Sequence, residues 1–254
     1  MLKQVYYMLN ELGFNPLKLK NLKYLPRLFK EWKKYNSENR RPAFQATFKG
    51  SMPLIADYAE SAGSIRTHYF HQDLWAARKL YNAKPQKHID IGSRIDGFIS
   101  NVLTFMDVTV VDVRPLDSNE VQGLSFICDD ATNLKTFKDE SIHSISTLHA
   151  AEHFGLGRYG DPVDPEATFK FMESLNRVLA KGGTLLFSVP IGRERVEFNA
   201  HRVFSINTIL ENFKELKLES FSYVDDKCIF HENVNVETVP DLNFGCGLFE
   251  FKKN

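Results

Sequence analysis

The fold is decided by residues 88–113, which read HIDIGSRIDGFISNVLTFMDVTVVDV. HIDIG (88–92) is a short apolar run that ends in a turn, and VTVVDV (108–113) is rich in β-branched residues. Between them, the apolar residues of GFISNVLTF (97–105) recur at helical spacing. A strand, a helix and a second strand in this order form a unit in which the two strands lie parallel. This stretch therefore predicts a parallel sheet.

The same alternation continues toward the C-terminus. Strands are predicted at residues 124–130, 141–149, 184–190, 216–224 and 247–253, and helices at residues 165–180 and 206–216. The last two strands leave little room for a crossover helix between them, so we expect them to pair antiparallel. The whole pattern predicts an α/β, Rossmann-like fold, with one mostly parallel sheet, a terminal antiparallel strand and helices on both faces.

The first 84 residues differ from the rest and are predicted to form a basic, mainly helical extension or lid, with the α/β domain at residues 85–254. Residues 1–50 carry 11 lysines and arginines against 3 acidic residues, a net charge of +8 in a chain whose formal net charge is zero. Residues 53–84 are predicted to be helical. Such a division of charge is typical of a basic arm that meets an anionic partner or surface.

Residues 17–36 of this extension form a basic amphipathic segment. Its apolar residues at helical spacing are Leu22, Leu25, Leu28, Phe29 and Trp32, with lysines between them. Pro26 is expected to begin or break a helix there. Two interpretations stay open. The segment contacts a membrane surface or a phosphate-bearing substrate, or it packs on its own domain or a second copy of the chain with its lysines in water.

The composition, with 43% hydrophobic and 25% charged residues, is that of a folded globular protein. The cysteines Cys128, Cys228 and Cys246 form no CxxC pair, and we interpret them as reduced, buried thiols of a cytoplasmic protein. No stretch approaches the ~20 apolar residues of a membrane span, and the N-terminus does not read as a secretory signal. We therefore expect a cytoplasmic location, at most peripheral to the inner face of the membrane. The α/β part is acidic, so nucleic acid is not the expected substrate.

Acidic residues stand at the ends of the first three predicted strands. The residues at these strand ends are Asp90, Gly92, Ser93, Asp112, Asp130 and Ala131. Ligands of open parallel sheets bind beyond the carboxyl ends of the strands, so we expect these six residues to bind a cofactor. Asp112 can accept two hydrogen bonds from a ribose diol, and Asp130 can accept one from an adenine amine. Because the G-x-G-x-x-G string is missing, the set favours an adenosine ligand without a diphosphate.

Several motifs together resemble the class I S-adenosylmethionine-dependent methyltransferases. They are HIDIGS (88–93), VVDVR (110–114), CDDATNL (128–134), TLHAAEHFG (147–155) and LNRVLAKGGTLLFSVP (175–190). AEHFGLGRYGDPVDP (151–165) and FNAHRVFS (198–205) are similar to a bacterial family of unassigned function whose members are associated with surface-polysaccharide gene clusters. The resemblance implies S-adenosylmethionine as cofactor. Asp90 and Gly92 would border its methionine part, Asp112 would hold the ribose, and Asp130 with Ala131 would meet the adenine.

Methyl transfer asks the protein to position an acceptor and, for a hydroxyl acceptor, to remove a proton. The loops after the fourth and fifth strands flank the active face in this architecture. The candidate catalytic residues are His149, Glu152, His153 and His201, and the candidates for binding the acceptor are Arg158, Tyr159, Asn199 and Arg202. Histidine titrates near neutral pH, a carboxylate can orient it, and arginine can fork onto a carboxylate or phosphate.

These residues also have purely structural interpretations. His149 can cap its strand, Arg158 can pair with an acid of its own loop, and His201 with Arg202 can hold their loop shut. HAAEH (149–153) fits an H-x-x-E-H zinc pattern, but that pattern needs a helix and this string leaves a strand. We therefore expect no zinc hydrolase and assign no metal ligand. An assisting metal among His149, His153 and the earlier His68 and His71 stays open.

Two functional hypotheses follow. The first is an S-adenosylmethionine-dependent methyltransferase that O-methylates a free, nucleotide-linked or lipid-linked carbohydrate in surface-polysaccharide biosynthesis. The carbohydrate rests on the family resemblance alone. The second is a methyltransferase-like binding or scaffold protein in glycan assembly, motivated by the sparse glycine loop. Another transferase on the same fold, and assembly into a homo-oligomer, stay open as well.

Overall fold

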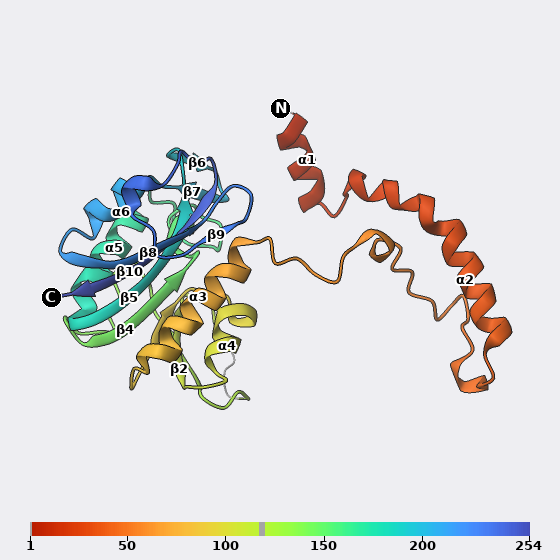
Figure 1. Cartoon of the computed structure of the whole chain (residues 1–254), viewed down its shortest axis with the longest axis horizontal. Coiled ribbons are helices and arrows are strands. Elements are labelled where there is room, and N and C mark those ends of the chain that lie inside the picture. The colour runs from red at the N-terminus through yellow and green to blue at the C-terminus, as the bar shows by residue number, and fades with distance from the viewer. Residues whose placement is uncertain (1, 117–119) are drawn as a thin grey trace. The chain divides into compact units, whose positions relative to one another are not determined.

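A computed structural model of the chain describes residues 2–116 and 120–254, and the chain divides into two compact units, Met1–Ser64 and Ile65–Asn254 (Figure 1). The sequence-based boundary follows residue 84 instead. The two boundaries differ by helix α3 (His68–Ala83), whose buried Trp75, Ala76 and Leu80 pack in the core of the larger unit.

The larger unit is built on a sheet with the strand order β3-β2-β1-β4-β5-β10-β8-β9. The strands are β1 (Ile89–Ile91), β2 (Val108–Asp112), β3 (Leu124–Cys128), β4 (Ile142–Leu148), β5 (Leu179–Ile191), β8 (Leu216–Val224), β9 (Phe230–His231) and β10 (Gly245–Lys253). Strands β1 to β5 are parallel, and β10 runs antiparallel to both β5 and β8. The predicted antiparallel pairing of the last two long strands is therefore confirmed.

Helices cover both faces of the sheet, as the alternation of elements predicts. On one face lie α3, a short π-helical turn η4 (Ile95–Ile99) and α4 (Ser100–Val102); on the other lie α5 (Ala167–Val178) and α6 (Ile206–Asn212) (Figure 1). Alternate side chains of β10 pack into the two hydrophobic clusters that lie on opposite faces of the sheet. Leu248 packs in the cluster on the α3 face, and Phe249 and Phe251 pack in the cluster with α5 and α6.

The helix predicted over residues 53–84 is shorter than expected. Of residues 53–84, only α3 and the single turn η3 (Asp57–Ala59) are helical. Helix α3 begins late because Thr67 caps it, its Oγ1 accepting from the backbone N–H of Phe70 at 3.1 Å. The prediction of three buried cysteines is confirmed for Cys246 and wrong for Cys128, which is exposed, and for Cys228, which is half-buried; all three thiols are free.

The N-terminal unit contains α1 (Leu2–Glu11), η1 (Pro16–Tyr24), α2 (Leu25–Glu38), η2 (Pro42–Phe44) and η3. Pro26 lies in the first turn of α2 and so begins a helix. None of residues 4–64 is fully buried, and Leu22 and Phe29 are 53% and 49% exposed. The apolar residues of the segment at 17–36 are therefore not sealed within their own unit. In the described parts of the chain, no helix combines the length and apolarity needed to cross a bilayer.

Candidate functional site

Three carboxylates follow one another along the edge where the parallel strands end. The register pairs Ile91 of β1 with Val111 of β2, and Asp112 of β2 with Cys128 of β3. Asp90 lies in β1, Asp112 ends β2, and Asp130 follows β3 by two residues. The predicted order of acids on adjacent strand ends is thus the order in the sheet.

Asp90 is fully buried and fixes the loop after β1. Its carboxylate accepts from the backbone N–H of Ser93 at 3.0 Å, from Ser93 Oγ at 2.6 Å and from Ser146 Oγ at 2.5 Å. Burial raises the pKa of Asp90 to about 6 despite these donors. Buried His88 bonds Ser144 and Ser146, each at 2.8 Å, and burial lowers its pKa to about 3, so it is neutral. This network ties β1 to β4.

Gly92 has a backbone that few other residues could adopt. Its φ is +72°, and a Cβ added there would lie 3.0 Å from Cβ of Ala150 in the loop after β4. Gly97 is also constrained, because a Cβ there would lie 2.4 Å from a carboxylate oxygen of the buried Asp73. Both glycines of the sparse loop are therefore required by close packing.

The other two carboxylates already have partners within the chain. Arg114 forks onto Asp112 through Nε at 3.0 Å and Nη2 at 2.7 Å, and its guanidinium lies 4.4 Å from the centroid of the Tyr159 ring. Asp130 accepts from the backbone N–H and Oγ1 of Thr132 and from the amide of Asn133. A nucleoside would have to replace the Arg114 fork to reach Asp112.

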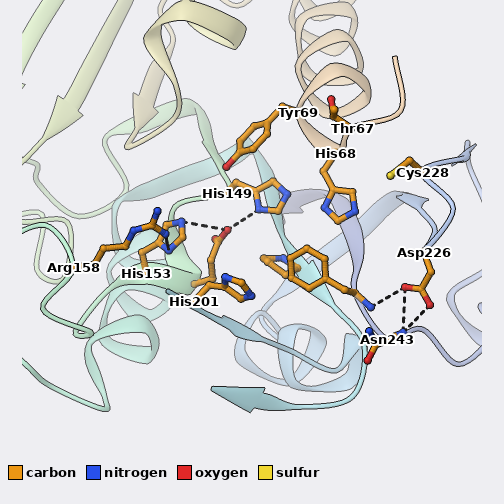
Figure 2. A pocket seen from close by; sticks show the side chains of 13 residues that line it. Thr67, His68, Tyr69, His149, His153, Arg158, His201, Asp226, Cys228 and Asn243 are labelled. Carbon is orange, nitrogen blue, oxygen red and sulfur yellow. Dashed lines mark hydrogen bonds and ion pairs between the residues drawn. The ribbon is translucent and has the colours of Figure 1, made fainter. Parts of the chain in front are cut away.

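A cavity of about 520 Å³ lies beside this edge (Figure 2). It is lined by Thr67, His68, Tyr69, His149, Glu152, His153, Arg158, Pro190, His201, Asp226, Cys228, Asn243 and Phe244. All four candidate catalytic residues line it, together with one candidate acceptor-binding residue, Arg158. None of the six candidate cofactor residues does. The structure therefore gathers the catalytic candidates and keeps the cofactor candidates on the neighbouring strand ends.

His149 and Glu152 form a buried pair in the cavity wall. His149 follows β4 with a left-handed φ of +52°, and its Nδ1 lies 2.6 Å from Oε1 of Glu152. Burial opposes charge on both groups. Nevertheless the pKa of Glu152 lies below its ordinary value because of the charge and hydrogen bond of His149, and the pKa of His149 lies above its ordinary value because Cys246 and Glu152 favour the imidazolium.

The other two histidines are neutral bases. His153 Nδ1 donates to the carbonyl of Ala200 at 2.6 Å, and its Nε2 lies 3.7 Å from Oε1 of Glu152. Burial lowers the pKa of both His153 and His201. Because Nδ1 of His153 holds the proton, its Nε2 is available as an acceptor.

The four candidates for acceptor binding are separated. Arg158 lines the cavity and donates to the carbonyl of Ala200 at 3.0 Å, and Tyr159 meets the His153 ring edge-on at 5.7 Å between centroids. Asn199 is exposed in the turn between β6 (Arg195–Glu197) and β7 (His201–Val203). Arg202 is buried and donates to two loop carbonyls, those of Phe154 at 2.6 Å and Pro165 at 3.2 Å. Arg202 therefore fixes the loop that contains Phe154 and Pro165, which agrees with its structural interpretation.

Several cavity residues are absent from the candidates chosen by sequence. Tyr69 comes from the start of α3, Asp226 from the loop after β8, and Phe244 from the residues before β10. No motif marks them. The signal for Phe244 is topological, because an antiparallel β10 begins at the edge where parallel strands end. The aromatic and histidine rings here stack on one another; His68 lies 5.3 Å from Phe244 and 5.6 Å from His149 between centroids.

Comparison with known proteins supports the fold. Residues 103–228, just under half of the chain, match a family model described as a Caenorhabditis protein of unknown function, DUF268. No curated protein sequence matches the chain. A putative sarcosine dimethylglycine methyltransferase from Galdieria sulphuraria is 12% identical with a TM-score of 0.52, over 72% of this chain and 86% of that chain. The [4+2]-cyclase SpnF is also 12% identical, with a TM-score of 0.51, over 76% of this chain and 85% of that chain. The chain has the class I methyltransferase fold. Because a cyclase shares it, the reaction has to be argued from the site.

Proposed function

We propose that this protein transfers a methyl group from S-adenosylmethionine to a small acceptor held in the cavity. The observation that carries the proposal is the ordered set of Asp90, Asp112 and Asp130 on three adjacent strand ends. Asp112 would accept from the ribose hydroxyls and Asp130 would meet the adenine. The loop at Gly92 and Ser93, which approaches Ala150 next to the cavity residue His149, would border the methionine part and its reactive methyl group.

The acceptor we propose is a carbohydrate hydroxyl, in keeping with the histidine-rich cavity and the family resemblance. A hydroxyl must lose its proton as the methyl group arrives. His149 is ill suited to take it, since Glu152 stabilises its protonated form. His153 is better suited, because it is neutral and its Nε2 is free to accept. Arg158, on the same wall, would contact an anionic group of the acceptor.

Calorimetric titration with S-adenosylhomocysteine tests the cofactor half of the proposal. We expect micromolar binding that Asp112→Ala weakens by about 100-fold, since hydrogen bonds to a charged group contribute roughly 1.5–3 kcal/mol each and Arg114 competes for part of that gain. Asp139→Ala is the matched control. Asp139 is also an arginine-paired acid, bonded to Arg177 at 2.7 Å, but it precedes β4 at the opposite edge of the sheet. Equal binding by both variants would refute the assignment of Asp112.

A second candidate is favoured by the fork between Arg114 and Asp112. If this ion pair is permanent, the ribose site is closed and the protein serves as a binding or scaffold subunit in glycan assembly. No heat from S-adenosylhomocysteine at millimolar concentration in the wild type would favour this second function. Binding gained only in Arg114→Ala would show that the fork alone closes the site.

A further inference from the structure

Two imidazole side chains and one thiol from distant parts of the chain lie close together beside the cavity. They are His68 at the start of α3, His149 after β4 and Cys246 in β10. One ligand atom from each lies within 4.8 Å of the other two. Figure 2 shows the rings of His68 and His149 side by side in the cavity wall. Cys246 is fully buried in the sheet beneath them, so the cluster joins the cavity to the core.

His149 is oriented as a metal-binding histidine is. Its Nδ1 is fixed by Glu152 at 2.6 Å, which leaves Nε2 as the free ligand atom. This Nε2 is buried and has no hydrogen-bond partner among the described residues. A buried polar atom without a partner costs roughly 1–3 kcal/mol, so an atom of this kind points to a ligand that satisfies it. The left-handed backbone of His149 adds a further strained feature at the same residue.

We propose that His68, His149 and Cys246 bind a zinc ion, with Glu152 as the positioning residue that orients His149. A thiolate and two imidazoles suit zinc, which takes sulfur at about 2.3 Å and nitrogen at about 2.0–2.1 Å in a tetrahedron. Donor atoms within 4.8 Å of one another need to close by roughly 1 Å to reach that geometry. His68 is half-buried in the first turn of α3, so it is the ligand with room to move.

Three protein ligands leave one position of the tetrahedron for another molecule. Because His68 and His149 both line the cavity, that position is open to what the cavity binds. The ligand class is then an oxygen or sulfur group that zinc can polarise, such as a hydroxyl, a thiol or water. This inference concerns the metal alone and does not depend on cofactor binding.

Metal analysis of the full chain tests the site. The metal is first removed with a chelator. The protein is then reloaded with zinc and freed of excess metal, and its zinc content is measured by mass spectrometry. A parallel sample is loaded with cobalt(II), because a cobalt–thiolate bond gives a charge-transfer absorption band in the near ultraviolet. We expect one ion per chain and a band that Cys246→Ser removes. Cys228→Ser is the matched control, since Cys228 lines the same cavity outside the cluster.

Further variants distinguish the loss of a metal ligand from the loss of the fold. His68→Ala should abolish stoichiometric binding, and His71→Ala, three residues along the same helix, should not change it. Glu152→Gln should weaken zinc binding by about 10–100-fold, the usual effect of removing an orienting partner. If Cys246→Ser fails to fold, His68→Ala decides, because His68 is only half-buried. Absence of stoichiometric zinc, or zinc retained by His68→Ala, would overturn the proposal and leave a metal-free contact between Cys246 and the two histidines. Asp112→Ala should still bind zinc with the wild-type stoichiometry. A failure of the zinc proposal can therefore be distinguished from a failure of the proposed cofactor binding.

Discussion

Asp90→Asn offers a quantitative test of the network that holds the loop after β1. Burial raises the pKa of Asp90 from an ordinary 3.8 to about 6, with the negative charge of Asp73 adding to the effect. The folded chain therefore keeps a proton on Asp90 over a pH range in which the unfolded chain has released it. Asparagine has nearly the same shape but does not titrate, so the variant removes this pH dependence. Its NH2 group cannot accept from the hydroxyls of Ser93 and Ser146, which lowers stability by an amount that does not depend on pH.

The sign and size of the effect follow from linkage. Because the folded pKa is the higher one, the stability contribution is complete below pH 3.8 and is lost as the pH rises through about 6. Between about pH 5 and about pH 7.5 the wild type should lose about 1.4 kcal/mol more unfolding free energy than Asp90→Asn. Except for Asp73, whose charge is coupled to that of Asp90, the other titrating groups are shared by the two proteins and their contributions cancel in the comparison.

Urea unfolding at the two pH values measures this difference. Trp75 is 3% exposed in the core of the larger unit, whereas Trp32 lies in the N-terminal unit, so both proteins should carry Trp32→Phe. Fluorescence then reports the unit that contains Asp90. Parallel pH profiles for the two proteins would refute the raised pKa. A wild type that gains stability over the variant as the pH rises would show a lowered pKa instead.

Three further predictions concern other parts of the chain. Gly92→Ala should cost about 1–3 kcal/mol in urea unfolding and more than Gly182→Ala, which shares a φ near +73° but has no atom within 4 Å of the added Cβ; equal costs would contradict the close approach to Ala150. Arg202→Ala should destabilise by about 1–3 kcal/mol for each buried carbonyl it leaves without a donor, with binding of S-adenosylhomocysteine unchanged; loss of that binding without loss of stability would show a direct role instead. Deleting residues 17–36 should release the protein from anionic liposomes in a flotation assay while cofactor binding persists, because the basic segment exposes apolar Leu22 and Phe29; unchanged flotation would rule out membrane contact through this segment.

The succession of the long strands along the chain could be predicted because each strand is an apolar run bounded by turns. Their limits were less certain where strand and turn residues mix. The KGG at 181–183 reads as a turn before a strand, yet β5 begins at Leu179 and runs through it, with an irregular register against β4 between Ile142 and Ser144. The register against β4 passes from Leu179 directly to Thr184, and Gly182 has a left-handed φ of +73°, so the predicted turn is present as a bulge inside the strand.

The site was predictable where a motif follows a parallel strand and not elsewhere. His149, Glu152 and His153 follow β4 directly, so their place in the cavity wall could be expected. Cys246 and Phe244 belong to a late strand whose neighbours depend on the whole sheet order. Their proximity to residues about a hundred positions earlier arises from β10 inserting between β5 and β8. The position of β10 between β5 and β8 cannot be predicted from the spacing of residues in the sequence.

The two halves of the proposed site meet at one close contact, which argues for a single reaction centre. The cofactor candidates lie on β1, β2 and β3, and the cavity lies on the loops after β4 and β5. Because β1 and β4 are neighbours in the sheet, the loop at Gly92 approaches Ala150, the residue after His149, so closely that a Cβ at position 92 would lie 3.0 Å from the Ala150 Cβ. A methyl donor bordered by Gly92 would thus face an acceptor beside His149. Replacing Gly92 by a larger residue should therefore lower the rate of methyl transfer by more than the accompanying loss of stability or of cofactor affinity would explain.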